Sequence, residues 1–161
     1  MVTTADIWSW MEDIFDPEIP VLTVVDLGVV RDVAIENNRP VITITPTYSG
    51  CPAMNTIEEE IVQKLVAEGF ENPEVKTVLH PAWTTDWMSE NGKKKLEEYG
   101  IAPPAGGSVN KKALFAEQDT VRCPQCKSEN THMVSQFGST ARKAMYQCKD
   151  CLEPFDYFKC L

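Results

Sequence analysis

The chain has 161 residues, enough to bury one hydrophobic core and to carry a small second module. Its formal net charge of −9 repels a phosphate backbone, so the composition argues against a nucleic-acid-binding protein. No apolar run approaches the roughly 20 residues that cross a bilayer, and the N-terminus lacks the pattern of a signal peptide. We therefore expect a cytoplasmic protein without membrane contact, whose six cysteines serve as metal ligands or reactive thiols.

The first hundred residues alternate between helical and β-type patterns, which predicts a domain of the α/β (α+β) class. Apolar residues at helical spacing predict a helix from Ala5 to Phe15, with Thr3 or Thr4 as its N-cap. Pro17 lacks an amide hydrogen and disfavours helical backbone at Asp16, so we expect the helix to end there.

Two β-type stretches follow at residues 28–35 and 40–45. The adjacent Asn37 and Asn38 tolerate positive φ, which predicts a hairpin between them. Farther along the chain we expect a helix that ends at Gly69, a strand from Val75 to Leu79 and a helix from Asp86 to Tyr99.

Residues 101–119 begin with IAPPAGGS, a proline- and glycine-rich stretch that is typical of a linker. The charge changes beyond it. Residues 1–119 carry 9 basic and 20 acidic side chains, whereas residues 120–161 carry 6 and 4. The sequence therefore predicts one domain at residues 1–100 and a second at 120–161.

Two C-x2-C pairs in the second region, Cys123 with Cys126 and Cys148 with Cys151, have the spacing of a zinc ribbon. A two-residue spacer lets both sulfurs reach one ion, and two pairs supply four thiolates in a tetrahedral site. Zinc is the expected structural ion, and rubredoxin-like iron is the alternative. Such a closed site has no open position for catalysis.

Three other features of this region leave alternatives open. His132 is either a competing ligand or an exposed strand histidine. Cys160 is either an unpaired thiol or part of a second, labile metal site. The aromatic residues near Cys160, namely Phe155, Tyr157 and Phe158, indicate a small ribbon core rather than a platform for stacking bases.

Cys51 lies between a β-type run and a helical one, with Gly50 before it and Pro52 after it. A helix N-terminus favours a thiolate, so the residue is either a functional thiol or a buried, inert side chain. Asp16 and Glu18 are either an acid/base pair or a turn cap with a solvated charge. No histidine is close to Cys51 in sequence, which argues against a thiol enzyme.

Three runs resemble the SufT-type domain, whose members act in the maturation of iron–sulfur proteins: DPEIPVLTVVDLGVVR at residues 16–31, TPTYSGCPA at 45–53 and PAWTTDWMS at 81–89. The runs FGSTARKAMYQC at 137–148 and EPFDYFKC at 153–160 are similar to the PaaD family. Proteins of that family are accessory subunits encoded with the phenylacetyl-CoA epoxidase system.

The resemblance implies a small mixed sheet with helices, followed by a zinc-ribbon β module. It implies that Cys51, together with Asp16 and Glu18, binds iron or an iron–sulfur cluster transiently. It also implies a role in maturing a metal centre of the epoxidase system in phenylacetate degradation, with the iron–sulfur reductase subunit as the main partner. A homodimer would bring two Cys51 thiols together.

One position departs from the family pattern. Between Ala141 and Lys143 relatives often carry cysteine, whereas this chain carries Arg142. If that cysteine pairs with the counterpart of Cys160 in relatives, this chain has lost half of a second site.

Two functions of different classes are compatible with these features. The first is a non-catalytic assembly factor that holds and delivers a metal centre. The second is an integral structural or docking subunit of the multicomponent oxygenase.

The linker generates a first testable prediction. Limited proteolysis should cut the chain between about residues 101 and 120, because exposed connections are the preferred sites of nicking. Mass spectrometry of the fragments would locate the cuts, and complete resistance would contradict a linker.

Overall fold

The computed structural model describes residues 1–104 and 121–158. It separates into two compact units. The first consists of Met1–Trp83 with Trp87–Ser89, and the second consists of Thr84–Asp86 and the described residues from Glu90 onward. No helix in the described ranges is long and apolar enough to cross a membrane.

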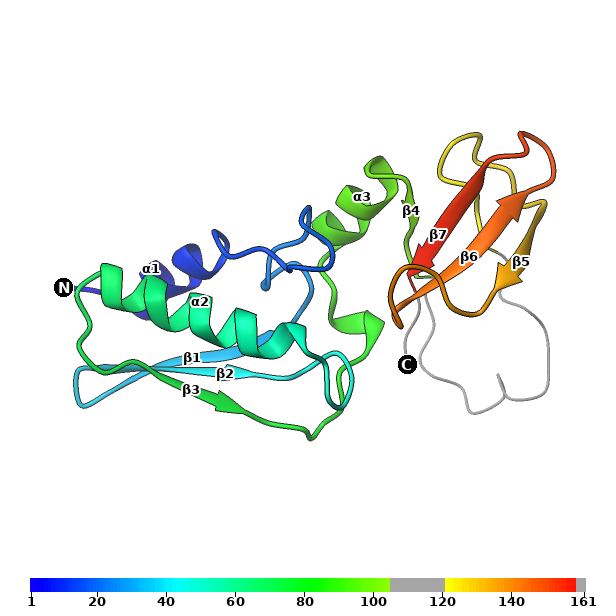
Figure 1. The fold of residues 1–161 in the computed structure, drawn as a ribbon. Helices are drawn as coiled ribbons and strands as arrows, with labels where there is room; N and C mark the ends of the chain where they lie inside the picture. Colours follow the sequence, from blue (N-terminus) through cyan, green and yellow to red (C-terminus); the bar gives the residue numbers. More distant parts are fainter. Residues whose placement is uncertain (105–120, 159–161) are drawn as a thin grey trace. The chain divides into compact units, whose positions relative to one another are not determined.

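The first unit is a three-stranded sheet with two helices on one face (Figure 1). Strand β1 (Val30–Glu36) pairs antiparallel with β2 (Arg39–Ile44), which pairs parallel with β3 (Glu74–Thr77). Helices α1 (Thr4–Met11) and α2 (Ala53–Ala67) pack over the sheet. The predicted mixed α/β architecture is confirmed.

The β1–β2 hairpin forms where the two asparagines predict it, with φ of 50° at Asn37 and 64° at Asn38. Thr3 is the N-cap of α1, and a capping box with Asp6 fixes this helix start. However, α1 ends at Met11 instead of Phe15. The backbone tightens there, and Phe15 forms a bridge with Thr23 that a helical residue could not form.

The predicted helix over residues 86–99 is divided into a short 3-10 turn, η1 (Thr85–Trp87), and α3 (Glu90–Glu98). The interruption has a tertiary cause. The Ser89 backbone N–H donates to the Asp26 carbonyl at 2.9 Å, and its hydroxyl donates to the Asp26 carboxylate at 3.0 Å. These bonds hold residue 89 against a distant turn rather than in a continuous helix.

The turn at Asp26–Gly28 also binds the tryptophans that precede Ser89. The Trp83 indole N–H donates to the Leu27 carbonyl at 2.9 Å, and Trp83 is buried. Trp87 packs directly on Gly28, and the Arg31 guanidinium lies 3.7 Å from its ring centroid. The turn therefore needs glycine, since Gly28 has φ of 78° and a Cβ there would lie 2.5 Å from the Trp87 carbonyl oxygen.

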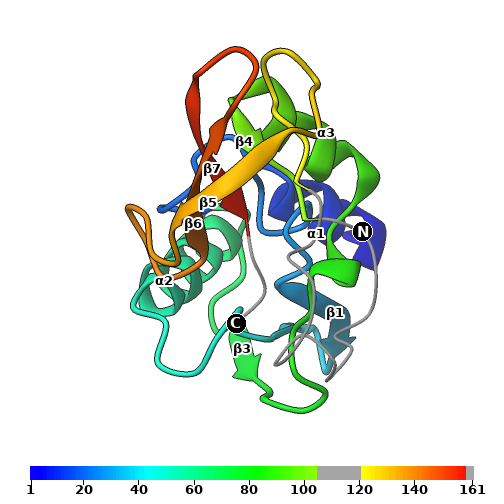
Figure 2. The same ribbon diagram turned by 90° about the vertical axis from the view of Figure 1, so that its right-hand side faces the viewer.

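The second unit contains α3 and a four-stranded sheet in the order β4-β7-β6-β5 (Figure 2). Its strands are β4 (Ile101–Ala102), β5 (Thr131–Ser135), β6 (Lys143–Cys148) and β7 (Pro154–Phe158). The first two residues of the expected linker are therefore not linker, because β4 pairs parallel with β7. The rest of that segment from residue 105 lies outside the described residues.

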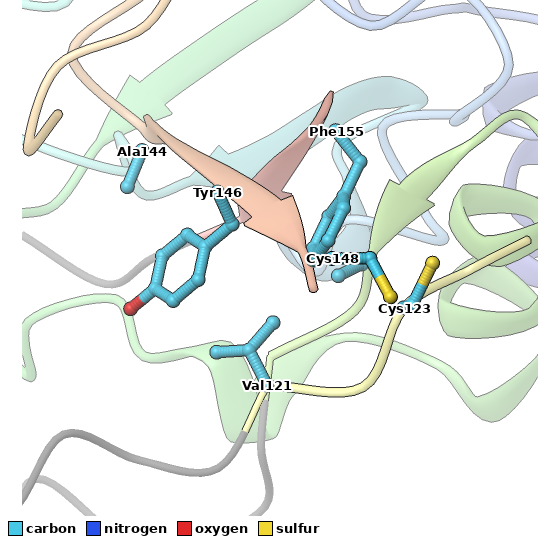
Figure 3. Close-up of a cluster of buried hydrophobic side chains, with 7 residues drawn as sticks. Val121, Cys123, Ala144, Tyr146, Cys148 and Phe155 are labelled. Carbon is cyan, nitrogen blue, oxygen red and sulfur yellow. The ribbon is translucent and has the colours of Figure 1, made fainter. Parts of the chain in front are cut away.

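A small hydrophobic core supports this sheet (Figure 3). Tyr146 stacks on Phe155 and meets Tyr157 edge-on, with ring centroids 6.0 Å and 5.4 Å apart. Phe158 is fully buried. The aromatic residues thus form the interior of the ribbon, as the sequence predicts.

Replacing Gly28 tests the packing of Trp87. We expect Gly28→Ala to lower the free energy of unfolding by about 3 kcal/mol, because left-handed backbone strain adds to overpacking. Gly50→Ala is the matched control, since Gly50 has φ of 75° and open space around its Cβ position. Urea denaturation followed by circular dichroism would compare them, and equal losses would show that Trp87 moves aside without cost.

Candidate functional site

The four cysteines predicted to bind a metal lie together at one end of the ribbon. All four sulfurs are within 4.8 Å of one another. Cys123 Sγ lies 3.7 Å from Cys151 Sγ, and Cys126 Sγ lies 3.5 Å from Cys148 Sγ. Each short distance joins one pair to the other, so the two C-x2-C pairs face each other across a single centre.

The two pairs have the same backbone geometry. The Cys123 N–H donates to the Ser128 carbonyl at 2.9 Å, and the Cys148 N–H donates to the Glu153 carbonyl at 3.0 Å. The residue after the second cysteine of each pair, Lys127 or Leu152, has φ of 66°. This repeated turn is a local consequence of the spacing and presents two sulfurs on the same side of each loop.

The sulfur arrangement fits a tetrahedral metal ion. Metal–sulfur bonds of about 2.3 Å in a tetrahedron place the sulfurs about 3.8 Å apart, close to the two short distances here. Four sulfur donors suit zinc, and tetrahedral iron is the alternative that the same donor set accepts. With all four positions filled by protein, a bound ion would stabilise the fold and leave no place for a substrate.

The core of the second unit positions the cluster from one side. Cys123 and Cys148 are buried with the hydrophobic side chains, and Figure 3 shows their sulfurs next to each other at the margin of that cluster. Cys126 and Cys151 are exposed. The centre therefore rests on the ribbon core and opens toward solvent at the other two cysteines.

The cysteines ionise unequally without a metal. Backbone N–H groups of Cys151 and Asp150 donate to the Cys148 sulfur and lower its pKa to about 7. The Glu153 N–H lowers the pKa of Cys151, but desolvation and the neighbouring sulfurs outweigh it and raise that pKa to about 12. At neutral pH the four sulfurs can therefore become thiolates together only around a cation.

Three neighbouring residues do not join this ligand set. His132 lies on β5, opposite Gln147, and is partly buried rather than exposed as expected. Arg142 is buried, with its guanidinium 5.7 Å from the Phe158 ring centroid, so the departure from the family pattern is an interior side chain. Cys160 lies outside the described residues.

Cys51 lies in the loop that leads from β2 into α2, and only 7% of it is exposed. Its N–H donates to the Tyr48 carbonyl at 3.3 Å, and its own carbonyl accepts from the Met54 N–H at 3.2 Å. Pro52 is the N-cap of α2. The thiol is thus at a helix N-terminus, as predicted, and it is also largely buried, so both interpretations of the sequence hold in part.

Asp16 forms a turn instead of an exposed acid/base pair with Glu18. It is buried, and its Oδ1 accepts from the N–H groups of Glu18 at 2.9 Å and Ile19 at 2.8 Å. Among the described residues, the ribbon cysteines form the one group of three or more side chains that could hold a metal. The structure therefore does not gather Cys51, Asp16 and Glu18 into a single ligand set.

Two residues near Cys51 were not predicted from the sequence. Thr45 and Thr47 are buried, and neither hydroxyl has a hydrogen-bond partner. An unsatisfied buried polar group costs about 1–3 kcal/mol, so two of them in one loop need a reason. Their signal was the polar TPT preceding SGC at a strand end, where threonine is also a common strand residue.

The metal site generates a prediction for each buried cysteine. Cys148→Ser and Cys123→Ser should each lose the bound metal and make residues 121–158 protease-sensitive, because four-thiolate binding contributes about 10 kcal/mol or more to such small folds. The control Cys51→Ala should keep its metal. Elemental analysis of purified protein would measure metal per chain, and one tightly held ion in both serine variants would contradict the assignment.

Two family descriptions match the two halves of the chain. Residues 4–78 match "Iron-sulfur cluster assembly protein", and residues 107–159 match "PaaD zinc beta ribbon domain". A crystal structure of a DUF59 domain from Bacillus anthracis aligns with a TM-score of 0.54 and 32% identity, covering 58% of this chain and 90% of that one. The assembly-type fold of the first unit is therefore shared with solved structures.

Curated relatives extend the match. A 1,2-phenylacetyl-CoA epoxidase subunit from Escherichia coli is 50% identical over 156 residues, covering 97% of this chain and 92% of that protein. The Fe-S protein maturation auxiliary factor YitW of Bacillus subtilis is 38% identical, covering 56% of this chain and 90% of that protein. The chain thus belongs to the PaaD family, in which an iron–sulfur cluster assembly domain is joined to a zinc ribbon.

Proposed function

We propose that this protein is an accessory subunit of the phenylacetyl-CoA epoxidase system that helps to assemble or deliver an iron–sulfur or iron centre to a partner subunit. The iron–sulfur reductase is the first candidate recipient. The observation that carries the proposal is the likeness to an epoxidase subunit over 97% of the chain, together with an assembly-type first half. No residue of the chain is assigned a catalytic role.

The two units supply different chemistry in this proposal. The four cysteines of the ribbon close around one ion, so that site is structural and does not release cargo. Cys51 is a single thiol in the other unit, without two further ligands gathered around it. A metal or cluster held there would need ligands from the recipient or from a second copy, which suits transfer better than storage.

The surroundings of Cys51 support a transient ligand. Thr45 and Thr47 contribute buried hydroxyls without partners to the same loop, and such groups can hydrogen-bond to a cluster sulfur or to a bound water. Gly50 leaves open space beside the thiol. A loop with unsatisfied polar groups gains more from a polar cargo than a fully satisfied loop would.

Asp16 and Glu18 have separate parts in the proposal. The Asp16 carboxylate fixes the turn by accepting from the Glu18 N–H, so Asp16 orients the segment rather than binding cargo with both oxygens. Glu18 is half-buried and is the carboxylate that we assign to transient iron binding. This division explains why an Asp-Pro-Glu sequence would serve better than two exposed acids.

The test compares Cys51→Ala with the unaltered protein in cells that produce the epoxidase subunits. We expect Cys51→Ala to keep its fold and ribbon metal, while the iron and sulfide content of the reductase subunit falls severalfold. Reductase that already carries its centre should restore turnover with the variant present, because an assembly factor is not needed once the centre is built.

The control is Thr131→Val in the ribbon, which removes a hydroxyl that hydrogen-bonds the Val121 carbonyl and should leave reductase maturation unchanged. A fully matured reductase in cells with Cys51→Ala would overturn the transfer role. Turnover that requires this protein even with matured reductase would instead identify an integral docking subunit.

A further inference from the structure

The two cysteine pairs are connected by a small polar network centred on Asp150. This residue lies inside the second pair, between Cys148 and Cys151. Its carboxylate reaches across to the segment that follows the first pair, residues 128–130. We propose that Asp150 is a positioning residue for the metal site, which holds the two pairs in register and thereby slows the loss of the ion.

Both carboxylate oxygens of Asp150 are used. Oδ1 accepts from the Asn130 side-chain amide at 3.0 Å, and Oδ2 accepts from the Ser128 hydroxyl. The Ser128 hydroxyl oxygen in turn accepts from the Asn130 backbone N–H at 3.0 Å. A backbone bond from the Lys149 N–H to the Asn130 carbonyl, at 2.8 Å, runs beside these contacts.

The network reaches the sulfurs at both of its ends. The Ser128 backbone N–H donates to the Cys126 sulfur, and the Asp150 backbone N–H donates to the Cys148 sulfur. These two sulfurs are the ones that lie 3.5 Å apart. The Ser128–Asp150 side-chain bond therefore links two residues that each orient one ligand of the centre.

Charge alone would place no carboxylate here. Four thiolates around a divalent cation carry a net charge of about −2, so a nearby carboxylate is repelled by the loaded site. The hydrogen bonds from Ser128 and Asn130 offset that repulsion, and their geometry is useful only if the two loops must stay together. Lys127 differs, since it bonds to the Pro124 carbonyl of its own loop and to Glu97 on α3.

The test uses the full-length protein and needs no epoxidase partner, so it stands apart from the assembly function. Zinc-loaded samples are mixed with excess chelator, and the rate of zinc release is measured. We expect Asp150→Ala to release zinc about 10–100-fold faster, the usual effect of removing a group that orients a metal ligand. Asp150→Asn keeps one acceptor oxygen and should fall between.

Glu129→Gln is the matched control, because it removes the same charge from the same loop while no side-chain hydrogen bond is given up. Its release rate should equal that of the unaltered protein. Ser128→Ala should also accelerate release, and adding Asp150→Ala to it should change the rate little further, since the two side chains form one contact.

Cobalt titration separates positioning from ligand loss. The absorption of cobalt-loaded Asp150→Ala at saturation should still be that of four thiolate ligands, with the change confined to affinity and release. Equal release rates for Asp150→Ala and Glu129→Gln would overturn the proposal. Loss of a thiolate ligand in the cobalt spectrum of Asp150→Asn would do so as well, because the residue would then maintain the ligand set itself.

Discussion

Four cysteine sulfurs within 4.8 Å of one another are the constraint on which the second unit depends. Sulfurs this close cannot all ionise without a cation between them, and the pKa values of Cys148 and Cys151 are driven apart accordingly. The hydrophobic core beneath them is small, and two of its members, Cys123 and Cys148, are themselves ligands. Metal binding and core formation in the ribbon are thus one event rather than two.

The first unit has no such centre among its described residues and is held together by conventional packing. Its sheet and helices bury an aliphatic core, while the Asp26–Gly28 turn binds Trp83, Trp87 and Ser89. Because this framework is complete without a metal, the Cys51 loop can carry unsatisfied hydroxyls without endangering the fold. Stability and polar reactivity are therefore carried by different residues within the same unit.

The pairing of these units gives a physical reason for a two-part accessory protein. A closed site keeps its ion and maintains shape, whereas a site with an incomplete ligand set can exchange its cargo. Placing the two on separate units prevents the strong four-thiolate site from competing for the same loop as the weak one. This arrangement is consistent with membership of a family that combines an assembly domain with a ribbon.

Sequence alone determined the features that depend on neighbouring residues. The C-x2-C spacing defined the ligands, the Asn37-Asn38 pair defined the hairpin, and Thr3 defined the start of α1, since each reflects geometry within a few bonds. The resemblance carried the family. Only the tertiary structure decided the burial of Cys51, the use of Asp16 in a turn, the unsatisfied hydroxyls of Thr45 and Thr47, the break before α3 and the pairing of Ile101–Ala102 with β7. Those outcomes depend on partners tens of residues away or on what covers a side chain, and no local pattern encodes either.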